Sequence, residues 1–209
     1  RGAGNLLGAE QSGFIADLGY ETYQRILKEA VMELKNEEFA DTLTASDGTS
    51  GDEEFVADCA VESDMELLLP PDYVPQESER ISLYKELDGI ERELDLQRFR
   101  MHLEDRFGKI PKVTSELLRV PRLRYLARRL GIEKIVLKQE QMYMYFVDDN
   151  NKAYYQSPMF GRILNYLQAH PRRCRIREKN GRRSLAIADV PTVEEAVSLL
   201  QEILSLNSI

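Results

Sequence analysis

An acidic stretch in the first third of the chain constrains the fold more than any other feature. Residues 36–64 contain ten aspartates and glutamates but neither lysine nor arginine, and residues 42–51 are mainly Thr, Ser, Gly, Ala and Asp. A segment with so few apolar side chains cannot offset the entropy that is lost on ordering. We therefore interpret residues 37–58 as a flexible acidic linker between a segment at 1–36 and a domain at 59–209.

The segment before the linker begins with a glycine-rich stretch and continues as an amphipathic helix. Its apolar side chains recur at spacings of three and four residues, which places them along one face of a helix. This face requires a cover, and left exposed it would favour pairing between copies of the chain. The apolar positions are Tyr20, Tyr23, Leu27, Ala30, Val31 and Leu34.

The domain after the linker carries helix and strand signals in mixed order. One extended run, from Val61 to Leu69, ends at two prolines, and further strands are predicted at 135–137 and 142–147. Helices are predicted from apolar spacing and from Gly or Pro at their ends, one of them beginning near Pro111. Their apolar positions are Leu83, Leu87, Ile90 and Leu94; Leu96, Phe99, Leu103 and Phe107, with Gly108 as the cap; Leu123, Leu126, Ala127 and Leu130, between Pro121 and Gly131; Phe160, Ile163, Leu164 and Leu167; and Val193, Ala196, Val197, Leu200 and Leu204.

Three local signals in the last third of the domain are specific. Asn180-Gly181 predicts a hairpin turn that pairs Cys174 with Ile187 and Ile176 with Leu185 on one face. Ser157-Pro158 predicts a helix N-cap, His170-Pro171 ends that helix, and Thr192 with Glu195 forms a capping box. Helices and strands in this order predict an α+β fold, with a mixed or antiparallel sheet covered by helices.

Composition limits the classes of function. The net charge is -8, and no stretch approaches the roughly 20 apolar residues that cross a bilayer, so we expect no membrane partner. Cys59 and Cys174 have no pairing pattern, which predicts a reducing, cytoplasmic location without disulfides. Neither His102 nor His170 sits beside a cysteine, so no metal site is expected.

No motif for catalysis or cofactor binding is recognisable. The glycines at 2, 4 and 8 do not fit a dinucleotide fingerprint, and the chain has no Gly-Lys-Ser/Thr phosphate loop. Adjacent acids such as Glu104 and Asp105 are typical of a solvated helix face. We therefore predict neither a catalytic residue nor a cofactor in this chain.

Arginines gather in two places and suggest an alternative function. Residues 172–183 hold seven basic side chains and one acid, and Arg173, Arg175 and Arg177 would share the hairpin face opposite the apolar pairs. Such a strip can bind phosphates without sequence preference. A second group comprises Arg119, Arg122, Arg124, Arg128 and Arg129. The alternatives are solvated faces with internal salt bridges, or a purely structural domain.

Two separate blocks resemble the bacterial transcription-repair coupling factors. The first runs Arg1-Gly2-Ala3-Gly4-Asn5-Leu6-Leu7-Gly8, then Glu10-Gln11-Ser12-Gly13, and then Leu18-Gly19-Tyr20 and Tyr23. The second comprises Leu69-Pro70-Pro71-Asp72-Tyr73-Val74-Pro75, Asp105-Arg106-Phe107-Gly108 with Pro111, and Leu130-Gly131-Ile132. The chain starts without Met, and we expect it to be a piece of a longer protein.

The resemblance implies that the parent is an ATP-dependent DNA translocase, with ATP and Mg bound outside this chain. It would act on duplex DNA, displace stalled RNA polymerase and recruit nucleotide excision repair. Residues 1–36 would then be the C-terminal part of the translocation motif, a glycine-rich loop followed by a helix. The motif positions are Arg1, Gly2, Gly4, Gly8, Gln11 and Gly13.

The same resemblance implies a regulatory role for residues 59–209. In the family this domain docks on the parent's N-terminal excinuclease-B-like module. It thereby hides the surface that recruits excinuclease A, the damage-recognition component of the excision nuclease. The corresponding inter-domain contact would involve Glu104, Asp105 and Arg106. His102 stands one turn earlier, where an acid is expected.

Overall fold

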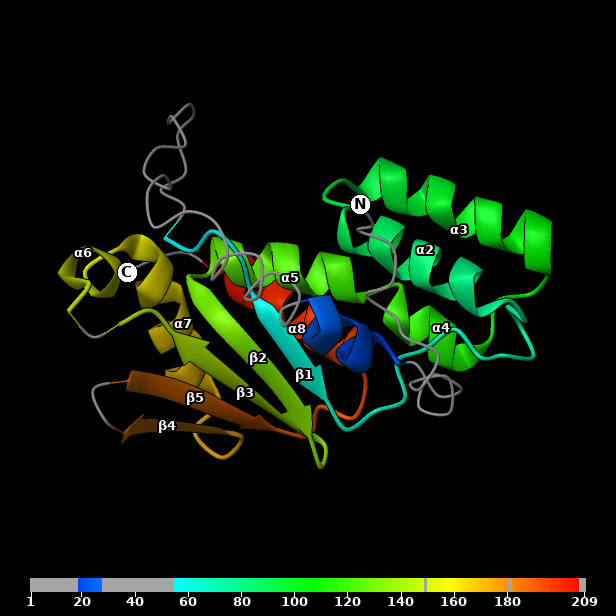
Figure 1. Ribbon diagram of the computed structural model, residues 1–209. Coiled ribbons are helices and arrows are strands. Elements are labelled where there is room, and N and C mark those ends of the chain that lie inside the picture. The colour runs from blue at the N-terminus through cyan, green and yellow to red at the C-terminus, as the bar shows by residue number, and fades with distance from the viewer. Residues whose placement is uncertain (1–18, 28–54, 149, 180–181, 207–209) are drawn as a thin grey trace, which may run out of the picture. The chain divides into compact units, whose positions relative to one another are not determined.

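The computed structural model describes residues 19–27, 55–148, 150–179 and 182–206 (Figure 1). The chain forms two compact units: one comprises residues 1–42 and 66–117, and the other comprises 43–65 and 118–209. Each unit is described by itself. The division differs from the single domain at 59–209 that the composition suggested.

The first unit is helical. Its elements are a helix at residues 20–27, α2 (Glu77–Asp88), α3 (Glu93–Phe107) and α4 (Lys112–Leu117). Tyr20 and Tyr23 are buried, and both rings contact the ring of Tyr84 in α2. Tyr20 and Tyr23 are therefore covered within the chain and are not presented to a second copy, whereas Leu27, at the end of the described part of this helix, is 38% exposed.

A break at Gly89 separates α2 from α3. The predicted stripe Leu83–Leu87–Ile90–Leu94 is wrong because α2 ends at Asp88, and its Gly89 cap donates back to the Glu86 carbonyl. Leu94 falls in the first turn of α3, where it is exposed. The predicted cap of α3 is confirmed: Gly108 has φ 82° and donates its N–H to the Glu104 carbonyl at 3.0 Å.

The second unit contains a five-stranded mixed sheet, which confirms the predicted fold class. Its order is β1-β2-β3-β5-β4, with β1 parallel to β2 and the other pairs antiparallel. The observed registers Cys174↔Ile187 and Ile176↔Leu185 are those predicted, while the turn at 180–181 lies outside the described residues. The strands are β1 (Ala60–Ser63), β2 (Ile132–Lys138), β3 (Gln141–Phe146), β4 (Cys174–Lys179) and β5 (Arg182–Ala188).

Helices α5 (Val120–Arg129), α7 (Pro158–Ala169) and α8 (Val193–Ser205) cover one face of this sheet, and α6 (Lys152–Tyr155) precedes α7 (Figure 1). The core of this layer includes the fully buried Met142 and Met144 of β3 and Ile135 of β2. Ser157 and Thr192 cap α7 and α8 as predicted. In α7 the third buried position is Tyr166, whereas the predicted Leu167 is only half-buried.

The structure differs from two predicted boundaries in the segment before α2, namely the end of the first strand and the end of the acidic linker. The run Val61–Leu69 is not one strand, because β1 ends at Ser63, whose hydroxyl accepts the N–H of Met65. Val61 belongs to the second unit and Leu69 to the first. The linker also ends earlier than residue 58, because Val56 is buried at 6% exposure within the second unit.

Candidate functional site

The Asp-Arg-Phe-Gly block at the end of α3 is fixed by a buried tyrosine. The Tyr73 hydroxyl lies 3.1 Å from the Leu103 carbonyl oxygen and 3.0 Å from that of Gly108. Burial, and then the nearby Glu104, raise the pKa of Tyr73 above its usual value. The hydroxyl therefore stays protonated and ties the segment before α2 to the end of α3.

The segment Leu69–Pro75 has a structural role in this unit. Arg80 of α2 is buried and donates to the carbonyls of Val74 and Pro75, at 2.8 and 3.1 Å. The Tyr84 hydroxyl accepts the N–H of Leu69 at 2.8 Å. These buried hydrogen bonds satisfy backbone groups that helix and sheet ladders do not reach. The segment thus holds α2 in place.

The three predicted contact residues of α3 have different surroundings. Glu104 is paired with Arg100 at 3.5 Å, and Arg106 with Glu79 of α2. Asp105 is exposed and has no ion-pair or hydrogen-bond partner among the described residues, and the same holds for His102. Of the three residues, Asp105 is therefore the one whose charged group is available to a second molecule.

Asp105 belongs to an outer face of α3 that also presents apolar side chains. Leu94 is 67% exposed and Met101 is 68% exposed. With Arg98 and Asp105 they follow a spacing of four, three and four residues, which places all of them on one face of the helix. The buried Phe99 and Leu103 are on the opposite face. The outer face of α3 combines exposed apolar surface with an available carboxylate.

The three arginines predicted to share a face of β4 do not do so. Arg173 lies just before β4, which begins at Cys174, and its side chain lines a pocket with residues of α7 and α8. The Arg173 guanidinium donates to the carbonyls of Ala188 and Asp189, each at 3.0 Å. Arg175 and Arg177 are exposed and have no ion-pair partner among the described residues. The strip is therefore reduced to two residues.

The second arginine group has internal partners around α5. Arg119 pairs with Glu194 at 3.2 Å, and Arg124 pairs with Asp58 at 2.7 Å. Arg128 donates to the Ala57 carbonyl at 3.2 Å. Arg122 and Arg129 lie against the ring of Tyr125. This group contributes to holding residues 57–58 and α8 on α5.

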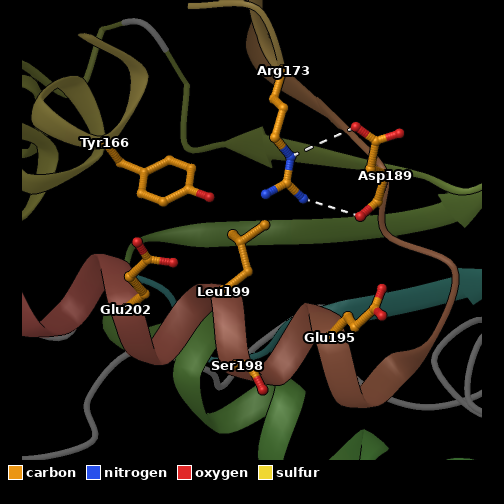
Figure 2. A pocket seen from close by; sticks show the side chains of 7 residues that line it. All are labelled: Tyr166, Arg173, Asp189, Glu195, Ser198, Leu199 and Glu202. Atoms are coloured by element: carbon orange, nitrogen blue, oxygen red, sulfur yellow. Dashed lines mark hydrogen bonds and ion pairs between the residues drawn. The ribbon is translucent and has the colours of Figure 1, made fainter. Parts of the chain in front are cut away.

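A pocket of about 470 Å³ lies in the second unit, lined by α7, α8, the residue before β4 and the residue after β5. Figure 2 shows Tyr166 and Arg173 on one side, and Glu195, Leu199 and Glu202 of α8 on the other. Ser198 and Asp189 complete the lining. The sequence analysis did not identify it, since only the fold brings Tyr166, Arg173 and α8 together.

The predicted translocation-motif residues lie outside the described part of the chain: Arg1, Gly2, Gly4, Gly8, Gln11 and Gly13. Among the described residues, no helix is long and apolar enough to cross a membrane. In the same residues, no group of three or more His, Cys, Asp or Glu is placed to hold a metal ion.

Comparison with known proteins gives a consistent result. Residues 63–157 match the TRCF domain. The chain is 32% identical to the transcription-repair-coupling factor of Escherichia coli (strain K12) over 176 residues, 84% of this chain and 14% of the relative. It is 36% identical to that of Haemophilus influenzae over 137 residues, 65% of this chain and 11% of the relative.

The fold has a solved counterpart. A crystal structure of the C-terminal domain of a transcription-repair coupling factor is similar with a TM-score of 0.55 and 18% identity, covering 70% of this chain and 92% of that one. The chain therefore carries a TRCF domain, with the fold of that C-terminal domain. Over most of its length it is similar to the transcription-repair-coupling factors, and it spans about a seventh of the length of its Escherichia coli relative.

Proposed function

We propose that this chain is the C-terminal part of an ATP-dependent DNA translocase that couples transcription to nucleotide excision repair. Within that parent, the unit containing α3 serves as an autoinhibitory interaction domain. It docks on the parent's own N-terminal excinuclease-B-like module and masks the surface that recruits excinuclease A. ATP and Mg are bound by the parent outside this chain, and RNA polymerase and duplex DNA are engaged through the parent. Residues 1–36 contribute the end of the translocation motif.

The outer face of α3 is the observation that carries the proposal. Leu94 and Met101 expose about two thirds of their surface on one helix face, together with Asp105. An apolar patch with an available carboxylate is typical of an interface that opens and closes, since each surface is also stable in water. Such a contact can be released when translocation favours a different arrangement of the parent, because differential affinity shifts a two-state balance.

The test is a titration of the chain with the parent's isolated N-terminal module, in which binding is measured by isothermal titration calorimetry. We expect the module to bind and excinuclease A to compete with it. Asp105→Lys should weaken binding at least about tenfold, because a charge of the wrong sign at an interface costs several kcal/mol. Met101→Ala should also weaken binding, through lost apolar contact.

A matched control is available on α2. Glu86 is exposed and has no side-chain partner among the described residues, so Glu86→Lys makes the same charge change away from the α3 face. We expect the Glu86→Lys variant to bind the N-terminal module as tightly as the unsubstituted chain does. Equal losses in both variants would indicate a general charge effect and contradict the proposed contact at Asp105.

A second candidate function is supported by the sheet. Strand register places Tyr145 opposite Ser184 and Ser184 opposite Arg177, and likewise Tyr143 opposite Ala186 and Ala186 opposite Arg175. Residues that face one another across an antiparallel ladder point to the same side. Two tyrosines and two exposed arginines therefore share one sheet face, a combination that suits single-stranded nucleic acid.

Duplex and single-stranded DNA are therefore parallel ligands in the same titration. The second function would be favoured over the α3 contact if the chain bound DNA alone and its affinity fell steeply as salt rose. Arg175→Ala and Arg177→Ala should then also lower the affinity for DNA.

A further inference from the structure

The pocket beside α8 is lined by a tyrosine hydroxyl that has no partner among the described residues. Tyr166 is 1% exposed, and its ring stacks on His170 with centroids 4.2 Å apart. Its hydroxyl has no hydrogen-bond partner among the described residues, although it lines the pocket and points into it (Figure 2). The Tyr166 hydroxyl therefore opens onto the pocket, where it can bond a group that enters from outside.

The charges of the lining favour a cation. Three carboxylates, those of Asp189, Glu195 and Glu202, face one guanidinium, that of Arg173. Arg173 is held by the carbonyls of Ala188 and Asp189 and lies 4.0 Å from the Asp189 carboxylate. Its charge is thus largely balanced locally. The two glutamates of α8 supply the excess negative charge.

These glutamates are not committed to partners of their own. Among the described residues neither Glu195 nor Glu202 forms an ion pair, in contrast to Glu194, which pairs with Arg119 at 3.2 Å. Seven residues of an α-helix separate Glu195 from Glu202 by roughly 10.5 Å along the axis. The buried Leu199 lies between them and presents an apolar surface. A long side chain with an apolar stem and a cationic head can cover Leu199 with its stem and place its head beside a glutamate.

We infer that the pocket binds an arginine or lysine side chain presented by an extended segment of a partner protein. The cationic head lies beside Glu202 and its stem covers Leu199, while Glu195 adds negative charge farther along α8. The Tyr166 hydroxyl accepts a hydrogen bond from the head, or donates one to a backbone carbonyl of the segment. Burial, and then Glu202, raise the pKa of Tyr166 above its usual value, so the hydroxyl keeps its proton. Phosphate-rich ligands are repelled by the two glutamates.

The test is an NMR titration of the full chain with the peptide Ac-Ala-Ala-Arg-Ala-Ala-NH2. We expect the amide resonances around Tyr166, Arg173 and Leu199 to move. The same peptide with citrulline, a neutral isostere of arginine, or with glutamate should leave them unchanged. We expect Glu202→Gln and Tyr166→Phe each to weaken binding about three- to tenfold, as the loss of one hydrogen bond or ion pair to a charged group does.

Glu194→Gln is the matched control. It removes the same charge one residue from Glu195, on the same helix turn, but it lies outside the pocket, so binding should stay unchanged. Tyr166→Phe should fold normally, because its hydroxyl bonds nothing in the described structure.

Three results would overturn the inference. One is an unchanged Kd in both Tyr166→Phe and Glu202→Gln. Another is equal binding of the citrulline or glutamate peptide. The last is movement of the pocket resonances with a short DNA duplex and not with the arginine peptide.

Discussion

The ring of Tyr23 stacks on the ring of Tyr84, with centroids 5.7 Å apart and planes 23° apart. The Tyr84 hydroxyl accepts the backbone N–H of Leu69 at 2.8 Å. One side chain of α2 therefore joins the helix at 20–27 to the segment that precedes α2. This arrangement explains why those two stretches belong to the same compact unit although the acidic region lies between them.

Removing the Tyr84 hydroxyl should destabilise the helical unit. Tyr84→Phe keeps the ring contacts but leaves the N–H of Leu69, a buried residue, without an acceptor. An orphaned buried donor costs about 1–3 kcal/mol. We expect the free energy of unfolding, measured by urea denaturation with far-UV circular dichroism, to fall by that amount.

Tyr143→Phe is the control for this prediction. The Tyr143 hydroxyl donates to the side chain of Gln141 on a half-exposed sheet face, so its loss should change the stability by less than about 0.5 kcal/mol. Equal effects of the two substitutions would show that the Leu69 hydrogen bond contributes little.

Gly131→Ala should be among the most destabilising single changes in the sheet-containing unit. Gly131 has φ 69°, and a Cβ there would lie 2.1 Å from Cε2 of Tyr154. Tyr154 cannot move away freely, because it is fully buried and its hydroxyl donates to the Leu130 carbonyl at 2.7 Å. We expect a loss of about 3 kcal/mol or more from overpacking and backbone strain combined, seen as a lower urea midpoint.

Gly161→Ala is the matched substitution within α7. A Cβ at Gly161 meets nothing within 4 Å, and the helical backbone suits alanine. This change should stabilise the protein by up to about 1 kcal/mol. A similar loss at both glycines would contradict the role assigned to the Gly131–Tyr154 contact.

The features that the sequence predicted correctly depend on neighbouring residues. The Cys174–Ile187 register follows from a turn signal and strand alternation, and the caps at Ser157 and Thr192 follow from side chains that bond within three residues. The position of Arg173 could not be predicted in this way, because the carbonyls that hold it lie 15 and 16 residues away.

Long-range packing accounts for the other differences. The cover of Tyr23 is supplied by Tyr84, far along the chain, and no local pattern indicates that pairing. The pocket of Tyr166 depends equally on α8. For α3 the sequence indicated Asp105 as a contact residue. It also assigned Leu94 to the apolar stripe of the preceding helix, so the exposed apolar face of α3 was not predicted.

Residues before Cys59 should contribute measurably to the stability of the sheet-containing unit. Val56 is 6% exposed, and the neighbouring Phe55 ring packs against Tyr154 with centroids 5.2 Å apart. Val56→Ala removes two buried methyl groups, so we expect the free energy of unfolding to fall by about 1–2 kcal/mol. The adjacent Ala57 is exposed, and Ala57→Ser should change it by less than about 0.5 kcal/mol. If Val56→Ala is also neutral, the acidic linker does extend to residue 58.

Stability should decline in alkaline solution because of a buried thiol. Burial, and then the Asp58 carboxylate, raise the pKa of Cys59 from 9.0 to about 12. The folded chain therefore keeps this proton over a range in which the unfolded chain releases it. The contribution is fully present below about pH 9 and is lost as the pH rises towards 12, at about 1.4 kcal/mol per pH unit.

Urea unfolding at about pH 7.5, 9 and 10 should show a steeper loss of stability for the parent chain than for Cys59→Ala. The variant retains Cys174 and Tyr84, whose pKa values are also raised, so the difference between the two slopes isolates Cys59. Parallel slopes would mean that the Cys59 thiol ionises as readily in the folded chain as in the unfolded one.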